Sequence, residues 1–135
     1  MSQPDFKARI VLEATVSPSE DAEKVSQAMK NVLGEVQFDS STSQNSTSLT
    51  TEDSKALFSI RNQLRDRHVR SAARKQMLQS SSGRSASLML NRQAAAAGVI
   101  ALCGSPEESP LGPLYLTVHS EKVAAAIEWL TAYPG

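Results

Sequence analysis

Hydrophobic and polar residues alternate along two stretches of the chain, Phe6 to Ser17 and Ala86 to Leu90. Because successive side chains of a strand point to opposite faces, each stretch predicts a strand with one buried face. Three other stretches predict further strands: Glu35 to Asp39, Val99 to Cys103 and Leu114 to His119. The pattern therefore predicts a sheet whose strands come from both halves of the chain.

Helices are predicted between these strands from capping residues and helical spacing. The sequence Ser17 to Glu20 has the form of a capping box with proline at the first helical position, and Gly34 is expected to end the helix that begins there. Asn91 is expected to cap a short turn, Arg92 to Ala97, and Ser120 is expected to cap a final helix. The buried faces of the first and last helices are expected to contain Ala22, Val25, Met29, Val32, Leu33, Val123, Ala124, Ile127 and Leu130.

The longest helical stretch, Ala56 to Gly83, contains no proline, and its only glycine is its last residue. Leu57, Ile60 and Leu64 share one face of this helix. A second apolar group lies about half a turn away from the first, and it consists of Val69, Ala72, Ala73 and Met77. One straight helix cannot bury both groups against a single sheet, so the sequence predicts two helical segments with a break near Asp66 to His68.

Residues Ser40 to Thr51 are almost all Ser, Thr, Asn and Gln. This composition is consistent with a loop, or with a polar hairpin whose second half, Ser46 to Thr50, is an edge strand. Thr50 or Thr51 is expected to cap the helical region that follows. The order of predicted elements indicates an α+β fold, with helices packed on one face of a mostly antiparallel sheet. The chain is expected to form a single domain, residues 1–135.

Charge is distributed unevenly along the chain, although its 14 Lys/Arg and 14 Asp/Glu sum to zero. Nine of the 14 basic residues lie between Lys55 and Arg92, where Asp66 is the only acid. A local basic patch attracts polyanions, and Arg is preferred where phosphate accepts two hydrogen bonds from one side chain. The candidate RNA-binding residues are Arg61, Arg65, Arg67, Arg70, Arg74, Lys75, Arg84, Arg92 and Gln93.

Three of these arginines, Arg67, Arg70 and Arg74, stand at i, i+3 and i+7 of the second helical segment. Their spacing predicts an exposed arginine row opposite the apolar face. A solvated helix face that only keeps the protein soluble would show the same spacing. Nearby, Ser80 to Ser85 could wrap a phosphate with backbone N–H groups or form a frayed helix end closed by glycine. Asn91 to Gln93 could reach RNA or cap neighbouring loops.

The sequence contains no recognisable pattern of catalytic, cofactor-binding or metal-binding residues. Cys103, His68 and His119 lack the context of a nucleophile and its base, and a metal site needs more Cys and His than the chain has. No Gly-rich nucleotide-binding motif is present. The sequence therefore predicts a protein that is not an enzyme and that binds neither a cofactor nor a metal.

Cysteine usage and hydropathy indicate the compartment. The single cysteine, Cys103, excludes an internal disulfide and is typical of a reducing environment. No signal peptide is visible, and the longest apolar run, Ala94 to Cys103, is too short to span a bilayer. We therefore expect a cytoplasmic protein without membrane contact.

Three segments carry a resemblance to a known family: LFSIRNQLRDRHVRSAARKQML from Leu57, SASLMLNRQAAAAGVIALC from Ser85, and ESPLGPLYLTV from Glu108. They resemble an uncharacterised archaeal family that is predicted to bind RNA and is linked by genome context to the exosome. With the N-terminal strand and helix, the match spans most of the chain. The resemblance implies a fold similar to that of the large-subunit ribosomal protein that binds five-S RNA, and it implies no established activity.

These observations together predict a non-enzymatic RNA-binding protein, with a role in RNA processing or ribosome biogenesis. Because aromatic residues make up only 4% of the chain, structured or double-stranded RNA is the expected partner. The rival hypothesis is a protein-interaction module whose basic helices dock on an acidic partner.

The strand Phe6 to Ser17 carries Val11 and Thr15 between the charged residues of its second face. Beside the Ser/Thr-rich segment, this strand is expected to leave an unprotected sheet edge or an open sheet face. Such a surface predicts a symmetric homodimer with an isologous contact.

Overall fold

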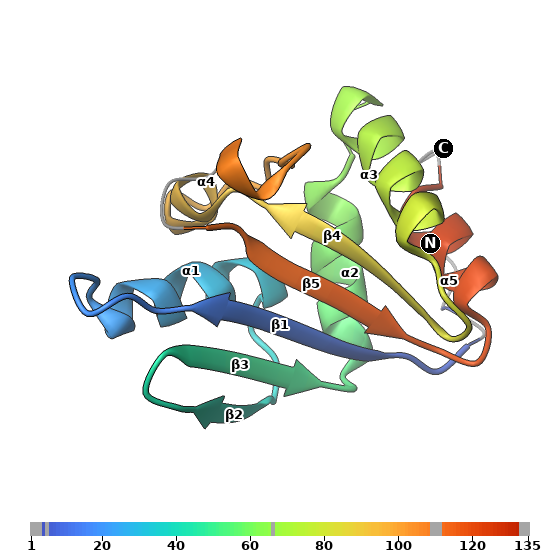
Figure 1. The fold of residues 1–135 in the computed structure, drawn as a ribbon. Coiled ribbons are helices and arrows are strands. Elements are labelled where there is room, and N and C mark those ends of the chain that lie inside the picture. Colours follow the sequence, from blue (N-terminus) through green and yellow to red (C-terminus); the bar gives the residue numbers. More distant parts are fainter. Residues whose placement is uncertain (1–3, 5, 66, 109–111, 133–135) are drawn as a thin grey trace.

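The structure is a computed structural model that describes residue 4 and residues 6–65, 67–108 and 112–132 of the 135-residue chain. Within these residues, five antiparallel strands form one sheet in the order β2-β3-β1-β5-β4 (Figure 1). The strands are β1 (Arg9–Thr15), β2 (Asp39–Thr42), β3 (Ser46–Thr51), β4 (Ser85–Leu90) and β5 (Leu114–His119). The helices are α1 (Ala22–Leu33), α2 (Ser54–Gln63), α3 (Arg67–Ser80), α4 (Arg92–Ala96) and α5 (Val123–Leu130), with a 3-10 turn η1 (Pro106–Glu108).

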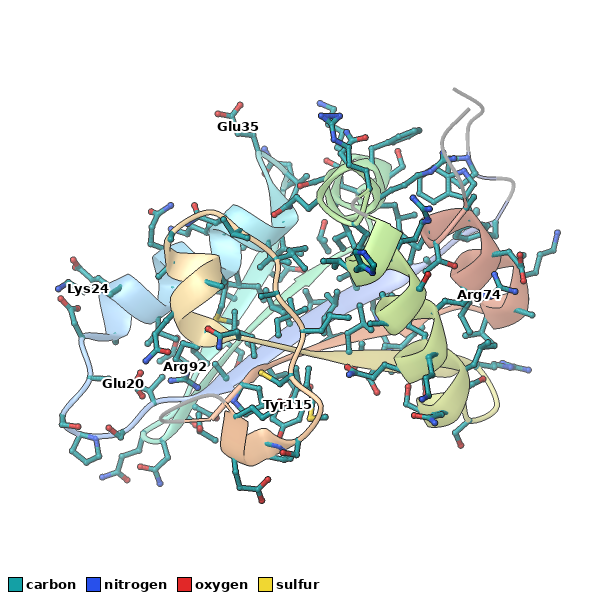
Figure 2. All side chains as sticks on the ribbon, turned by 90° about the horizontal axis from the view of Figure 1, so that it is seen from above. Glu20, Lys24, Glu35, Arg74, Arg92 and Tyr115 are labelled. Atoms are coloured by element: carbon teal, nitrogen blue, oxygen red, sulfur yellow. The ribbon has the colours of Figure 1, made fainter. Side chains whose placement is uncertain are left out.

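Helices α1 to α5 lie on one face of the sheet, behind the strands in Figure 1; Figure 2 shows the molecule turned by 90°. The covered face carries a row of buried leucines on neighbouring strands, Leu49, Leu12, Leu116 and Leu88. Met29, Leu33 and Ile60 of the helices belong to the same core. Burial of a side chain of this size contributes about 1.5–3 kcal/mol. The opposite face is open and carries Arg9, Glu13 and Tyr115. The predicted α+β fold is therefore confirmed.

Three of the predicted strands are confirmed and two are wrong. Strands β1, β4 and β5 form where residues alternate. The segment 99–103 is not a strand, because it touches the end of β4 only through an isolated bridge between Leu90 and Leu102. The segment 35–38 is not a strand either; β2 begins at Asp39, and Val36 and Phe38 of the preceding connection pack partly buried against the core.

The Ser/Thr-rich segment forms the hairpin β2–β3, so the hairpin alternative is confirmed and the loop is not. Its second strand, β3, is an interior strand that pairs with β1 through Leu49 opposite Leu12. Thr47, Leu49 and Thr51 of β3 are buried. The edge strand is therefore β2, all of whose side chains are exposed, and not Ser46 to Thr50 as the composition predicted.

Several helices begin later than predicted, and in α1 and α2 another side chain provides the cap. In the predicted capping box, the Ser17 amide donates to Glu20 Oε1 at 3.0 Å, but the segment is a turn, and Asp21 caps α1. Asp53 caps α2, whereas Thr51 lies in β3, where its hydroxyl accepts a hydrogen bond from the Asp53 amide at 3.1 Å. Helix α5 begins at Val123, after the residue predicted as its cap, Ser120. The predictions for Asn91 and Gly34 are confirmed.

The predicted break between the two basic helical segments is confirmed. Helix α2 ends at Gln63, Leu64 follows it with a fully buried side chain, and α3 begins at Arg67. Asp66, where the break was centred, lies outside the described residues. The apolar face of α3 is rotated from the predicted one, since Arg70, Ala73 and Met77 are buried and Ala72 is exposed.

The first and last helices show the same kind of shift in their buried faces. Ala22 and Ala124, which were predicted as core residues, are exposed. Ala28 and Ala126, which were not, are buried. The reason is that a helix with alanines on several sides buries whichever side its neighbours approach.

Candidate nucleic-acid interface

The basic window Lys55–Arg92 contains α2 and α3, and side-chain hydrogen bonds hold α3 along the outer edge of β4. The Ser80 hydroxyl accepts from the Ser87 amide and donates to the Ser87 carbonyl, both at 2.9 Å. Gln76 Oε1 accepts from the Met89 amide at 2.6 Å, and Gln76 Nε2 donates to the Cys103 carbonyl at 2.8 Å. These contacts fill hydrogen-bonding positions of an edge strand and fix which side of α3 faces solvent.

Arg70 is buried, with 8% of its surface exposed, and its Nη1 donates to the Arg65 carbonyl at 3.1 Å. This bond joins the connection that follows α2 to the first turn of α3. The predicted row of exposed arginines is therefore wrong at Arg70. The physical reason is its position one turn from Ala73 and two turns from Met77, on the side that packs against the sheet.

Arg61 lies over the ring of Trp129 from α5, with 4.7 Å between its guanidinium carbon and the ring centroid. Trp129 also makes edge contacts with Phe58 at 5.0 Å and Phe6 at 6.1 Å between ring centroids. Within the described residues, Arg61 Nη1 and Trp129 Nε1 are buried without a hydrogen-bond acceptor. The Arg61 side chain therefore packs α2 onto α5 through a cation–π contact.

Arg92 is buried at the start of α4, where Nη1 donates to both carboxylate oxygens of Glu20 at 2.8 and 2.6 Å (Figure 2). Burial acts to raise the pKa of Glu20. The hydrogen bonds from the Ser17 amide and Arg92, and the charge of Arg92, outweigh burial and hold this pKa below its ordinary value. Arg92 was predicted to be an RNA-binding residue, which requires an accessible side chain, but its side chain is buried.

Arg74 forms an ion pair with Glu128 of α5, and both side chains remain largely exposed, at 42% and 63%. The hydrogen bond and charge of Glu128 raise the pKa of Arg74, and the same hydrogen bond lowers the pKa of Glu128. Arg74 is therefore accessible to a ligand, but it already has a partner on the protein surface.

The remaining predicted residues lie on the surface. Arg65, Lys75, Arg84 and Gln93 are exposed, and Arg84 is 3.8 Å from Glu121 in a solvated ion pair. Arg67 begins α3, and its side chain is outside the described part of the structure. We refer to Arg65, Arg74, Lys75 and Arg84 as the exposed basic set.

The turn from Ser80 to Ser85 is closed by its own backbone. The Ser82 amide donates to the Ser85 carbonyl at 2.9 Å and the Ser85 amide donates back to Ser82 at 3.1 Å, with Gly83 at φ 59° between them. These two N–H groups are occupied, which favours the structural explanation of this segment over a phosphate loop. Cys103 is buried, and burial followed by the charge of Glu108 raises the pKa of its thiol, as in an unreactive cysteine.

A second group of basic residues, which the sequence analysis did not single out, lies at one end of the sheet. Lys7, Arg9 and His119 line a hollow there together with Arg84. The pairing of Arg9 with His119 across β1 and β5 brings this group together. No signal in the sequence gives this register, because the two residues are 110 positions apart along the chain.

Comparison with known proteins identifies the family. A family model described as RNA binding matches residues 9–120. A UPF0201 protein of Sulfurisphaera tokodaii is 36% identical over 128 residues, which covers 91% of this chain and 86% of the relative. The chain belongs to the UPF0201 family. A UPF0201 protein of Thermococcus onnurineus is 32% identical over 123 residues, which covers 90% of this chain and 89% of the relative. The predicted membership of an uncharacterised archaeal family described as RNA binding is confirmed.

Solved UPF0201 structures share the fold. The crystal structure of the UPF0201 protein from Methanococcus jannaschii matches with a TM-score of 0.75 and 18% identity, over 94% of this chain and 95% of that one. A DUF54 protein from Methanothermobacter thermautotrophicus also matches, with a TM-score of 0.63 and 21% identity, over 93% of this chain and 96% of that one. Within the described ranges, none of the helices is both long and apolar enough to cross a membrane.

Proposed function

We propose that this UPF0201 protein is a non-enzymatic, cytoplasmic RNA-binding protein that contacts structured RNA through its exposed basic set. The observation that carries the proposal is the segregation of charge, with nine of 14 basic residues and one acid between Lys55 and Arg92. The description of the family as RNA binding supports it. Phosphate contacts from a local basic surface provide most of the sequence-independent affinity for nucleic acid.

The character of the exposed side chains favours structured RNA over single strands. Phe58 and Trp129 pack edge to face inside the helical layer, so their rings are engaged with each other. Among the described residues, the one aromatic ring counted as exposed is that of Tyr115, and it lies on the open face of the sheet, away from the helices (Figure 2). Contacts to phosphates and 2′-hydroxyls therefore fit this surface better than stacking on aromatic platforms.

Arg61 and Arg70 contact other parts of the protein, and they stabilise the helices around the exposed basic set without belonging to it. Arg70 links the connection after α2 to α3, and Arg61 links α2 to α5. Their role in this proposal is to hold Arg65, in that connection, and Lys75, on α3, in fixed positions. A surface that is held in place loses less conformational entropy when it binds.

We place this activity in RNA processing or ribosome biogenesis, with an RNA-processing complex such as the exosome as the larger partner. The support is the resemblance of three segments to a family with that genomic association, and the similarity it implies to the five-S-RNA-binding ribosomal protein. Crosslinking the protein to RNA in cells and sequencing the bound RNA tests this placement. Recovery of ribosomal or processing intermediates is expected, and random recovery of all transcripts contradicts it.

We also propose a homodimer formed through β2. The outer edge of β4 is occupied by α3, whereas β2 is an edge strand with fully exposed side chains and little charge. An open edge strand can pair with its own copy about a two-fold axis. Light scattering at micromolar concentration checks this, since a mass that stays at the 14.5 kDa of one chain would exclude the dimer.

The RNA proposal is tested by titrating a fluorescent RNA hairpin with the protein at several salt concentrations. The triple substitution Arg65→Glu, Lys75→Glu and Arg84→Glu is expected to abolish measurable binding. Single substitutions are expected to reduce the salt slope by about 1 for each lost phosphate contact. Lys24→Glu, an exposed change on α1 outside the set, is the matched control.

Two outcomes of this titration decide between the hypotheses. Wild-type binding to the purified hairpin, with no other protein present, is expected if the surface binds RNA. Absence of RNA binding, or equal binding by the triple variant, contradicts the proposal. Binding of the same surface to an acidic protein in that case supports the rival interaction module.

A further inference from the structure

We propose that the hollow at the end of the sheet binds a nucleoside phosphate, namely the phosphorylated terminal nucleotide of an RNA strand. The hollow lies where β1 and β4 begin and β3 and β5 end (Figure 1). The inference rests on the proposed function in one respect, that the nucleotide belongs to RNA. The chemistry of the hollow stands independently of that function.

Four basic side chains from three segments of the chain line the hollow, Lys7, Arg9, Arg84 and His119. Arg9 and His119 face each other directly in the β1–β5 ladder, and His119 is paired on its other side with Ser85. Directly paired residues of antiparallel strands have their Cβ atoms about 5 Å apart. The register therefore sets Arg9 beside His119, and Arg84 directly precedes Ser85, the residue paired with His119 on its other side.

The wall of the hollow is held in place by Ser120, whose side chain is buried. Its hydroxyl donates to the Lys7 carbonyl at 2.7 Å and accepts from the Lys122 amide at 3.1 Å. Its amide donates to the Arg84 carbonyl at 2.8 Å. One residue thus fixes the backbone at both Lys7 and Arg84, so the positions from which these two side chains extend are set before a ligand arrives.

The acids that line the hollow do not cancel this charge. The hollow is lined by two acids, Glu52 and Glu121, and by three Lys or Arg side chains, Lys7, Arg9 and Arg84, so the basic side chains outnumber the acids. Glu121 is 3.8 Å from Arg84, and the two side chains are 86% and 77% exposed. A solvated pair of this kind contributes little, so a phosphate can replace the carboxylate as the partner of Arg84.

The size and the apolar part of the hollow match one nucleotide. Its volume is about 680 Å³, within the 300–1,000 Å³ typical of small-molecule sites. Phe6, Ala8 and Leu57 contribute apolar atoms beside the cations. A single nucleotide has the same division, with an apolar base and ribose beside a charged phosphate. The hollow has room for one nucleotide, and the phosphorylated end of a strand presents one nucleotide with an additional phosphate charge.

The test compares three versions of one RNA hairpin, with a 5′-phosphate, with a 3′-phosphate, and with hydroxyl groups at both ends. We expect one phosphorylated version to bind about tenfold more tightly than the hydroxyl version. This ratio corresponds to about 1.4 kcal/mol of binding free energy. Arg9→Gln, and independently Lys7→Gln, should reduce that ratio towards one. Lys75→Gln should weaken all three RNAs equally, and Lys24→Gln none of them. A folded-state check by thermal melting accompanies each variant.

A second measurement separates this proposal from the function it rests on. Calorimetry with adenosine monophosphate as the probe tests the hollow without RNA. Nucleotide binding that Arg9→Gln removes supports the hollow even if no hairpin binds, a result that would contradict the RNA function and indicate a free nucleotide as the ligand. Equal binding of all three hairpins, with no binding of the nucleotide, overturns the hollow as a site and leaves RNA binding by the exposed basic set intact.

Discussion

Two ion pairs in this molecule join the same two chemical groups in opposite surroundings. Arg92 and Glu20 are 6% and 8% exposed, whereas Arg74 and Glu128 are 42% and 63% exposed. Both pairs link segments far apart in the sequence, by 72 and 54 positions. A buried pair has lost its hydration, so removing one partner leaves the other as a buried charge without a counter-charge. In an exposed pair water can replace the missing partner, so the loss of stability is small. The basic window thus contains arginines that hold the fold and arginines that are accessible to a ligand.

The largest effect is expected for Arg92→Met, which leaves the Glu20 carboxylate buried without its counter-charge. We expect the free energy of unfolding to fall by about 3–5 kcal/mol in urea titrations. The double variant Arg92→Met/Glu20→Met should recover much of this loss, because no buried charge remains. If the single and double variants are equally unstable, lost packing and not the stranded charge is the cause.

A smaller loss is expected for Arg70→Met, which keeps the apolar stem but removes the hydrogen bond to the Arg65 carbonyl. Removal of such a charge-assisted bond costs about 2 kcal/mol. Because the bond ties the start of α3 to the connection before it, hydrogen exchange at the first turns of α3 should accelerate more than exchange in β1. Uniform acceleration throughout the protein would show that Arg70 does not act locally at the break.

A third test of the contrast between the two ion pairs is the pH dependence of the stability that Glu20 contributes. The pKa of Glu20 is lowered in the folded protein, so its contribution is complete above its unfolded value of about 4.3 and is lost as pH falls through the lower folded value. Glu20→Gln should therefore be less stable than wild type at pH 7, and the difference should shrink towards pH 3. A difference that is constant between pH 7 and pH 3 contradicts the ionised pair.

The smallest effect on stability is expected for Glu128→Gln, because its partner Arg74 is already solvated. The melting temperature should stay within the error of the measurement. RNA affinity should rise by about threefold, since the substitution removes an acid beside the exposed basic set. Destabilisation comparable to that of Arg92→Met would abolish the contrast between the two pairs.

Local patterns were sufficient to predict several elements of this fold. Alternation in β1 and β4 is a signal that each strand carries within itself, because one face is apolar over its whole length. The half-turn shift between Leu64 and Val69 likewise predicted the break between α2 and α3, since no straight helix buries both. The Asn91 cap is similarly local, with its side chain accepting from the Ala94 amide three residues on.

Other features depend on partners that the local sequence does not contain. β2 and β3 have few apolar residues, and β3 is an interior strand because β2 pairs with one of its edges and β1 with the other. Residues 99–103 are apolar enough for a strand, but they pass the end of β4 without forming a ladder.

The sequence by itself determined where the basic residues are concentrated, and only the tertiary structure decided which of them are accessible. Arg65, Arg70, Arg84 and Arg92 all belong to the same basic stretch of the sequence. Arg70 and Arg92 are nevertheless buried, whereas Arg65 and Arg84 are exposed. The difference comes from groups brought near by folding, such as Glu20 for Arg92. The cluster of Arg9 and His119 arises in the same way, from strand register alone. Short-range periodicity records how one element meets the core, whereas the burial of a charge depends on the position of its counter-charge after the chain has folded.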